Sequence, residues 1–321
     1  MEQSKRHRKF GLHSRNRHKG HYNFELLKQL VPELSEYVYN NRGIDTIDFS
    51  NPEAVKLLNQ GLLKQYYKLE YWKIPDNYLV PPIPGRGDYI HFVADLLRDT
   101  ASKGNDKIPR GRNIRVLDIG VGANCIYPII GCMEYDWYFV GSETDDIAFI
   151  NANEIVESNK KISRYIEIRK QKSNNIFYNI IKSDEFYDLS ICNPPFHSSE
   201  TEAQKSNLRK IKGIKAKSSD PKNFGGISNE LWCEGGEKEF VNSIILESKE
   251  FESNCLWFTT LVSKESNLNT FYKQLKSIQV DTYGVYEMNH ANKKARILYW
   301  SFLKQKQREK WISIKLALNA K

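Results

Sequence analysis

Apolar residues follow two different patterns along this chain of 321 residues. Short runs that are apolar at nearly every position predict buried strands, and longer segments with an apolar residue every three or four positions predict helices. The predicted strands cover residues 114–119, 137–142, 165–169, 187–192, 255–261, 281–287 and 296–302. The predicted helices cover residues 88–99, 124–131, 145–158, 237–249 and 267–277.

The order of these elements predicts the fold class. Strands that alternate with helices, and that are apolar along their whole length, indicate a mostly parallel sheet covered by helices on both faces. The last two strands have no helix between them, so we expect an antiparallel hairpin at one edge of the sheet. The prediction is an α/β fold with a Rossmann-like, seven-stranded, mostly parallel sheet.

The first 80 residues have a different pattern. A helix is predicted at residues 23–30, and a second helix follows Asn51, which can act as its N-cap, with Pro52 in the first helical position. Residues 74–87, rich in Pro and Gly, are typical of an irregular linker. We therefore expect a basic arm and an accessory helical module over residues 1–80, and the α/β domain over residues 81–321.

The formal net charge of +9 favours an anionic partner such as nucleic acid. Residues 1–28 contain eight Lys or Arg against two acids, and residues 205–222 contain seven against one. Either run alone is as consistent with a solvated surface as with a binding site. Because both flank the predicted site, they favour a surface that binds phosphates.

The cysteines and the hydropathy exclude several classes of protein. The five cysteines are scattered without a Cys-x-x-Cys pair, so we expect neither a disulfide framework nor a metal site. No apolar stretch approaches the roughly 18 residues of a membrane span. The first ten residues lack the apolar core of a secretory signal. We expect a cytoplasmic protein with no membrane contact.

Two loops that follow strands have the composition of a nucleoside site. Ligands of an open parallel sheet bind beyond the carboxyl ends of its strands. In "VLDIGVGANCIYP", Asp118 ends a strand, and Gly120 and Gly122 let the backbone turn tightly beside a ligand. Cys125 stands where a dinucleotide fingerprint has a third small residue, so a nucleoside with a small charged tail fits better. Glu143, after the next strand, is a candidate ligand of ribose hydroxyls.

A third loop, "NPPFHSS", follows the strand at residues 187–192. Asn193 can offer a side-chain carbonyl, Pro194 a backbone carbonyl directed by Pro195, and Phe196 a ring face. Two acceptors beside an aromatic ring suit a planar base that carries an amino group. The alternative is a tight turn around a buried Phe196.

These loops and further motifs together resemble a known family. The chain resembles class I S-adenosylmethionine-dependent methyltransferases that act on planar amino groups, and most closely the ribosomal RNA large subunit methyltransferase F family. The motifs that carry the resemblance are "HSRNRHKGHYNF" (13–24), "PPIPGRGDYIHFVADLL" (81–97), "LDIGVGANCIYP" (117–128), "CNPPFHSS" (192–199), "ELWCEGGEKEF" (230–240) and "ARILYWSF" (295–302). A eukaryotic relative that methylates U6 small nuclear RNA is more distantly similar. The chain departs from the family at His290-Ala291, where Gln-Gly is more frequent.

The resemblance implies an activity, a cofactor and a substrate. It implies transfer of a methyl group from S-adenosyl-L-methionine to N6 of adenine 1618 in 23S ribosomal RNA. We expect a monomer that acts on this RNA or on an assembling large subunit. The residues expected at the reacting base are Asn193, Pro194, Pro195 and Phe196. Those expected at the cofactor are Arg86, Asp118, Gly120, Gly122, Glu143, Asn193 and Ser173, or Asn174 in place of Ser173. Those expected at the RNA are Arg15, Arg17, Lys19, Lys205, Arg209, Lys210 and Lys212.

Other functions use the same loops. Protein glutamine N5-methylation needs a similar amide-recognising loop, although a peptide substrate does not require two basic clusters. Methylation of adenine in DNA is a second enzymatic alternative. A ribosome-assembly factor that binds RNA without catalysis is the third.

Overall fold

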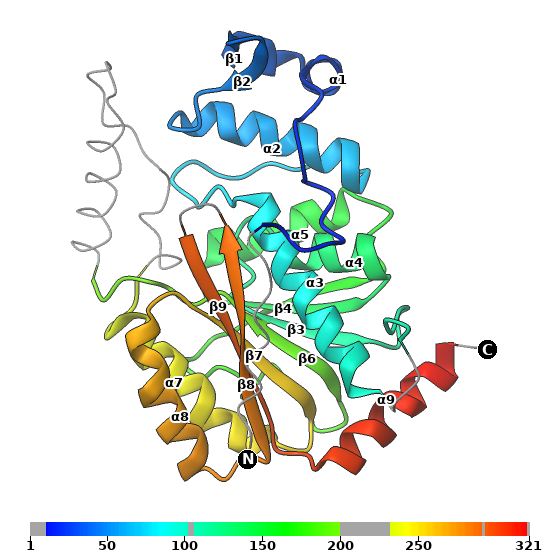
Figure 1. Cartoon of the computed structure of the whole chain (residues 1–321), viewed down its shortest axis with the longest axis vertical. Coiled ribbons are helices and arrows are strands. Elements are labelled where there is room, and N and C mark those ends of the chain that lie inside the picture. The colour runs from blue at the N-terminus through cyan, green and yellow to red at the C-terminus, as the bar shows by residue number, and fades with distance from the viewer. Residues whose placement is uncertain (1–10, 102–105, 200–231, 291–292, 320–321) are drawn as a thin grey trace.

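The computed structural model describes residues 11–101, 106–199, 232–290 and 293–319. A central sheet of seven strands crosses the molecule in the order β5-β4-β3-β6-β7-β9-β8 (Figure 1). Its strands are β3 (Arg115–Ile119), β4 (Tyr138–Glu143), β5 (Ile166–Lys170), β6 (Tyr187–Cys192), β7 (Cys255–Val262), β8 (Thr282–His290) and β9 (Lys293–Ser301). The first five are parallel to one another, whereas β9 pairs antiparallel with both β7 and β8. The predicted parallel sheet with a closing hairpin is confirmed.

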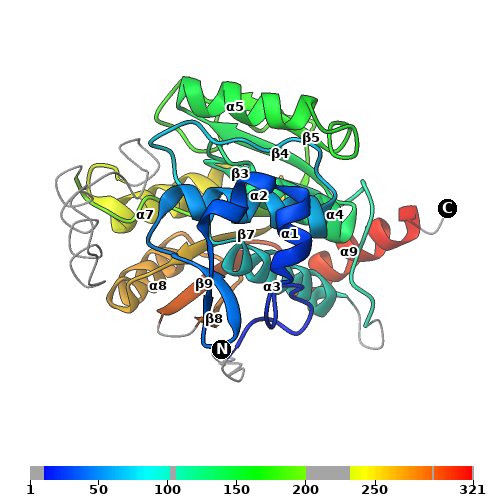
Figure 2. The same ribbon diagram turned by 90° about the horizontal axis from the view of Figure 1, so that it is seen from above.

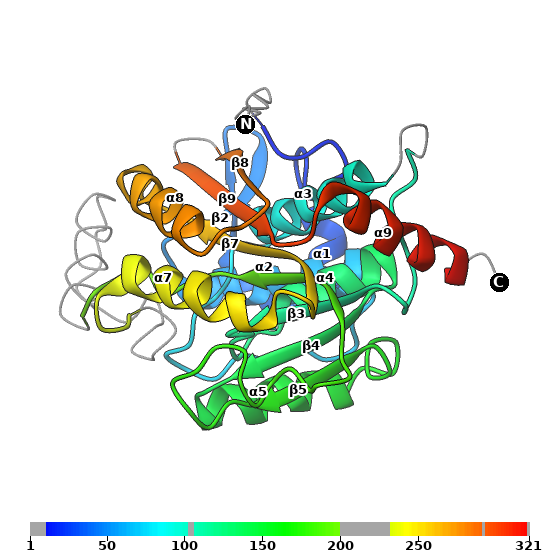
Figure 3. The ribbon, with the colours of Figure 1, turned by 90° about the horizontal axis from the view of Figure 1, so that it is seen from below.

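Helices cover both faces of this sheet (Figures 2 and 3). One buried apolar cluster includes residues of α3 (Ile83–Thr100), α4 (Ile126–Tyr135), α5 (Asp146–Glu157) and α9 (Gln305–Asn319). The other includes residues of α7 (Gly236–Ser248) and α8 (Leu268–Ser277). All residues of β6 and β7 are buried, as expected for strands covered on both sides. In the described part of the chain, no helix is long and apolar enough to cross a membrane.

The N-terminal module lies at one end of the molecule, at the top of Figure 1. It consists of α1 (Phe24–Leu30), the 3-10 helix η1 (Pro32–Tyr37), a hairpin of β1 (Val38–Asn41) and β2 (Ile44–Ile47), and α2 (Pro52–Tyr67). The Asn51 side chain accepts from the backbone N–H groups of Glu53 and Ala54, so the predicted cap is confirmed. Apolar residues of the module share a core cluster with α3 and α4, which fixes it to the α/β domain.

The structure differs from the predicted helices in two places. The helix predicted from residue 88 begins at Ile83, inside the expected linker, because Pro84 lies in the first turn, where a missing N–H costs nothing. The chain after residue 303 forms α9, a helix that the apolar pattern did not predict. The extended start of α3 matters for the site, because it contains Arg86.

Candidate functional site

A cleft of about 670 Å³ lies beyond the carboxyl ends of β3, β4 and β6. Its walls come from the loops after β3, β4, β5 and β6 and from the beginnings of α3, α4 and α7. The predicted site residues that line it are Arg86, Gly120, Gly122, Glu143, Ser173, Asn174, Asn193 and Pro195. Residues separated in sequence thus meet in one cavity, because parallel strands present their carboxyl ends at the same edge.

The glycine loop after β3 forms the floor of this cleft. Gly120 and Gly122 both have φ of 68°, in the left-handed region that favours glycine. A Cβ at Gly120 would meet nothing within 4 Å, so its hydrogen faces open space. The Gly122 N–H donates to Oε2 of Glu143 at 2.8 Å, which ties this loop to the next one.

Glu143 is buried and oriented by backbone donors. Its Oε1 accepts from the N–H groups of Thr144 and Asp145 at 2.8 and 3.0 Å, and its Oε2 accepts from Gly122. Burial raises the pKa of Glu143 above its ordinary value, while these backbone hydrogen bonds act in the opposite direction. A carboxylate has about four acceptor positions, so three backbone donors leave capacity for a ligand hydroxyl.

Asp118 lies beneath the glycine loop and does not line the cleft. It is fully buried, and neither carboxylate oxygen accepts a hydrogen bond from any described residue. Burial and the nearby Glu143 carboxylate raise the pKa of Asp118 well above its ordinary value, and Arg86 opposes them. The Arg86 Nη1 donates to the Tyr127 hydroxyl at 2.8 Å, which holds the guanidinium at the cleft.

The loop after β6 presents a polar atom with no partner. Asn193 is half-buried, and its Oδ1 accepts no hydrogen bond within the described ranges. Pro194 and Pro195 are buried, and only Pro195 lines the cleft with Asn193. Phe196 is half-buried and is not among the lining residues, so its role as a base platform stays a prediction.

The loop after β5 supplies Ser173 and Asn174. Both the N–H and the hydroxyl of Ser173 donate to Oε1 of Gln171, at 3.0 and 2.9 Å. The Gln171 side chain in turn donates to the Tyr178 carbonyl at 2.8 Å. Side-chain hydrogen bonds therefore fix the shape of this wall.

The three basic residues predicted to contact RNA differ in their surroundings. Arg15 is anchored inside the protein, since its guanidinium donates to Asp95, to the Tyr135 hydroxyl and to the His91 carbonyl at 2.8–2.9 Å. Arg17 and Lys19 are exposed. Arg17 pairs with Glu134 at 2.7 Å, and the Lys19 Nζ donates to the Ser14 carbonyl at 2.7 Å. The geometry gives Arg15 an anchoring role, and RNA contacts of all three stay predictions.

The other basic residues predicted to contact RNA belong to the run at residues 205–222. Lys205, Arg209, Lys210 and Lys212 lie outside the described residues.

Several lining residues were not predicted. Tyr127, Trp232, Glu234, Glu239 and Phe240 also face the cleft. Trp232 and Glu234 belong to the motif "ELWCEGGEKEF", for which no role was predicted. Tyr127 could have been predicted from its position just after the glycine loop, at the beginning of α4.

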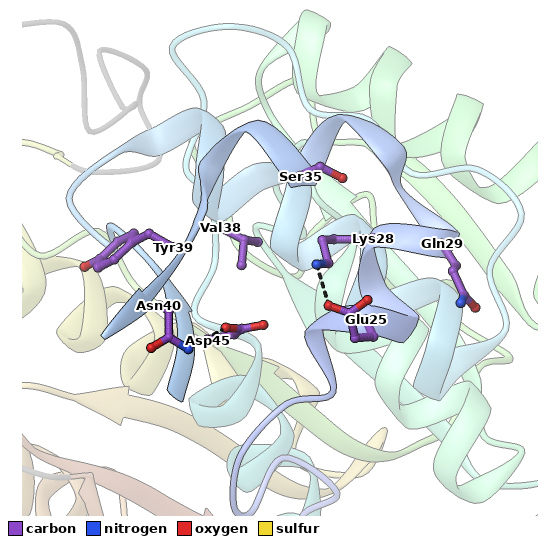
Figure 4. Close-up of a pocket in the computed structure, with 8 residues that line it drawn as sticks. All are labelled: Glu25, Lys28, Gln29, Ser35, Val38, Tyr39, Asn40 and Asp45. Carbon is purple, nitrogen blue, oxygen red and sulfur yellow. Dashed lines mark hydrogen bonds and ion pairs between the residues drawn. The ribbon is translucent and has the colours of Figure 1, made fainter. Parts of the chain in front are cut away.

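A second pocket, of about 390 Å³, lies in the N-terminal module (Figure 4). Its charged side chains already pair locally. The Lys28 Nζ contacts Oε1 of Glu25 at 2.5 Å, and the Asn40 amide donates to Asp45 at 3.0 Å. It contains none of the predicted site residues, so the cleft above the sheet is the candidate site.

Comparisons with known proteins show the family of the chain. A family model described as RNA methyltransferase matches residues 6–304. The chain is 51% identical over 301 residues to Ribosomal RNA large subunit methyltransferase F of Bacteroides thetaiotaomicron, covering 91% of this chain and 98% of that protein. It is 46% identical over 306 residues to the protein of the same name from Pectobacterium carotovorum, covering 95% and 97%.

Solved structures resemble the chain over nearly its whole length. The hMettl16 catalytic domain in complex with MAT2A 3'UTR hairpin 6 has a TM-score of 0.75 and 32% identity, covering 91% of this chain and 98% of that one. The N-terminal domain of human METTL16 in complex with SAH has a TM-score of 0.71 and 29% identity, covering 91% and 99%.

Proposed function

The chain belongs to the ribosomal RNA large subunit methyltransferase F family, and from this premise we propose that it methylates N6 of a single adenine, adenine 1618, in 23S ribosomal RNA. Its fold is that of a class I methyltransferase, and its cofactor is S-adenosylmethionine. Residues 81–321 carry out the transfer in this proposal, and residues 1–80 help to grip the RNA. The substrate is the free RNA or an assembling large subunit, and the enzyme acts as a monomer.

One observation carries the proposal for the acceptor. Asn193 lines the cleft, and its buried Oδ1 receives no hydrogen bond from the described residues. An unsatisfied buried acceptor costs roughly 1–3 kcal/mol, so a ligand that donates an N–H there is favoured. The amino group of an adenine supplies two such hydrogens, one for Asn193 and one for the Pro194 carbonyl.

The residues on the other side of the cleft fit the cofactor. The proposed contacts are the Gly120–Gly122 backbone, the Glu143 carboxylate for ribose hydroxyls and the Arg86 guanidinium for the methionine carboxylate. When bound, S-adenosylmethionine supplies an electrophilic methyl group on a sulfonium. The bond from N6 to the methyl carbon forms as the carbon–sulfur bond breaks, and a proton leaves the nitrogen for water.

The chain accelerates this displacement mainly by orientation. The N6 lone pair is delocalised into the ring, so it is a poor nucleophile. Hydrogen bonds from both N6 hydrogens to fixed oxygens favour a pyramidal nitrogen, and they strengthen toward the transition state. Holding nitrogen, methyl carbon and sulfur in line contributes most of the remaining acceleration.

The test is transfer of labelled methyl to ribosomal RNA from cells that lack this gene. We expect N6-methyladenosine in large-subunit RNA with the wild type, and a loss of at least ~100-fold in rate with Asn193→Ala, because misorientation alone costs about that much. Asn153→Ala is the matched control, since Asn153 lies in α5 and does not line the cleft.

Parallel acceptors separate the alternatives. Labelling of duplex DNA or of a protein glutamine in place of RNA would reject the proposal. Cofactor binding with no transfer to any acceptor would favour the assembly factor.

A further inference from the structure

The segment Trp232–Gly236 is part of a motif without an assigned role. It lies directly against the chain that follows Asn193–Phe196, the loop after β6 that we call the acceptor loop. Trp232 forms a parallel β-bridge with His197, the residue after Phe196. The Cys233 N–H donates to the His197 carbonyl at 3.1 Å. Trp232, Cys233 and Glu234 line the same cleft as Asn193 and Pro195. The segment is therefore a wall of the site and a neighbour of the loop that holds the base.

The segment is a tight turn that depends on two glycines. The Gly236 N–H donates to the Cys233 carbonyl at 2.9 Å, and the Cys233 thiol lies 3.4 Å from the Gly236 carbonyl oxygen. Gly235 and Gly236 have φ of 74° and 64°, a conformation that glycine adopts without strain. These two consecutive left-handed residues are the N-cap and the first residue of α7.

The backbone of a neighbouring segment lies so close to Gly236 that a side chain there would displace it by a few tenths of an ångström. A Cβ there would lie 3.1 Å from the Ser198 nitrogen and 3.2 Å from the His197 carbonyl carbon. Both are backbone atoms, so no rotamer change can relieve the contact. The turn and the chain after the acceptor loop therefore fix one another's position.

The next residue anchors the turn to the sheet. Glu237 is buried, and its carboxylate accepts from the Ser263 N–H at 2.7 Å and from the Asn267 side chain at 2.8 Å. Ser263 follows directly after β7. A continuous series of contacts thus connects the end of β7 to Glu237, Gly236 and the backbone at His197.

We propose that the Trp232–Gly236 turn is a positioning element of the acceptor site. It holds the backbone that follows Phe196, and thereby directs the Asn193 and Pro194 oxygens toward the reacting amino group. This inference rests on the function proposed above and assigns a role to the second wall of the same cleft. The turn does not hold the cofactor, which binds at the glycine loop and Glu143 in that proposal.

Gly236→Ala tests this role. We expect kcat for methyl transfer to fall ~10-fold, because the added Cβ displaces the His197–Ser198 backbone by a few tenths of an ångström, and a misplacement of about 1 Å costs roughly 100-fold. The Kd of the cofactor should stay within about twofold of the wild type, which a general loss of structure would not allow. Gly43→Ala is the matched control. Gly43 lies in the distant β1–β2 hairpin with φ of 85°, and a Cβ there would meet nothing within 4 Å. Alanine at this position therefore has the same backbone strain but displaces no neighbouring atom.

A second readout needs no acceptor. Hydrogen exchange of the Cys233 and Gly236 amides, which donate to the His197 and Cys233 carbonyls, should become faster in Gly236→Ala and stay unchanged in Gly43→Ala. This measurement separates the two proposals, since it tests the turn even if the wild type methylates no RNA. If Gly236→Ala does not fold, Glu237→Gln takes its place with the same readouts, because it weakens the anchor and keeps the side-chain shape. Unchanged kcat and exchange, or equal losses of cofactor binding and transfer, would overturn the inference.

Discussion

Two side chains at the cleft keep polar atoms that no described residue satisfies. Oδ1 of Asn193, a residue that lines the cleft, is buried, and both carboxylate oxygens of Asp118 are buried beneath the glycine loop. Each such atom lowers the stability of the folded protein by roughly 1–3 kcal/mol. Proteins keep groups of this kind where a ligand or a reaction uses them, so a stabilising substitution there is expected to impair function.

Asp118→Asn should stabilise the protein at neutral pH. Because burial raises the pKa of Asp118, the folded protein binds a proton over a pH range in which the unfolded chain has lost it. The free energy of unfolding therefore falls as pH rises above about 4, and Asn removes this dependence. We therefore expect Asp118→Asn to have a higher free energy of unfolding than the wild type at pH 8. The gain should shrink toward pH 4.

Urea unfolding at several pH values measures this effect, with the exposed Asp184→Asn as control. A variant that is less stable than the wild type at pH 8 would contradict the argument. Weaker binding of the cofactor is the expected functional loss.

The N-terminal segment and α3 are held together by a buried polar network. Asp95 of α3 contacts His13 Nε2 at 3.0 Å, Arg15 Nη1 at 2.9 Å and Arg98 Nη1 at 2.8 Å. Asp88 accepts from the His13 N–H at 3.0 Å and from the Asn16 side chain. Arg86 lies in the first turn of the same helix. The network therefore attaches the segment around His13 to the helix that carries Arg86.

Asp95→Asn should loosen this attachment. Burial alone would raise the pKa of Asp95, but hydrogen bonding to His13 and the charges of Arg15 and Arg98 outweigh it and hold the pKa below its ordinary value. The stabilisation is therefore complete above the unfolded pKa of about 4 and is lost as pH falls below it. We expect a cost of about 3 kcal/mol at pH 7, typical of removing one partner of a buried ion pair.

Chemical denaturation at pH 7 and pH 3 tests this prediction, and the difference from the wild type should decrease at the lower pH. Asp99→Asn is the control one turn farther along α3, where a surface pair with Arg98 contributes about 0.5 kcal/mol. Equal costs for both variants would show that the buried network adds nothing.

The order and type of the sheet elements could be predicted from sequence because the central strands are nearly continuous in apolar residues, as in β6 and β7. The strand predicted at residues 114–119 is β3 (Arg115–Ile119), and the one at 187–192 is β6 (Tyr187–Cys192). The start of α3 was missed because Pro and Gly usually mark loops, whereas here Pro84 lies in the first turn. The β1–β2 hairpin was missed because its strands have only four residues each and few are buried.

The site could be predicted as far as topology brings loops together. Gly120, Glu143 and Asn193 each follow a parallel strand, so their meeting in one cleft follows from the strand pattern. The pattern of strands does not predict contacts between individual side chains of segments that are distant in sequence. The charge of Arg15 indicated RNA, but its partner Asp95 lies far along the chain. The approach of Gly236 to His197 is equally invisible in the sequence.

The candidate cleft and helix α9 lie at opposite ends of the strands of the sheet. The cleft lies at the carboxyl ends of the strands, whereas α9 packs near their amino ends (Figure 1). Ile312 of α9 is completely buried in the core cluster. The Trp311 Nε1 donates to Oδ1 of Asp188 at 2.8 Å, and the Lys315 ammonium contacts its Oδ2 at 3.2 Å. Asp188 belongs to β6, the strand that ends at the acceptor loop.

Trp311→Phe tests whether the two ends are independent. The substitution keeps an aromatic ring but removes one donor from the buried Asp188 carboxylate, so we expect a loss of about 1–2 kcal/mol in the free energy of unfolding. Ile314→Ala on the same helix is the control, since Ile314 is 51% exposed and surface changes usually stay within about 0.5 kcal/mol. The cofactor Kd and the rate of methyl transfer should match the wild type, because neither Trp311 nor Asp188 lines the cleft. A lower rate in Trp311→Phe, measured where the protein is fully folded, would instead show that β6 transmits changes from α9 to the acceptor loop.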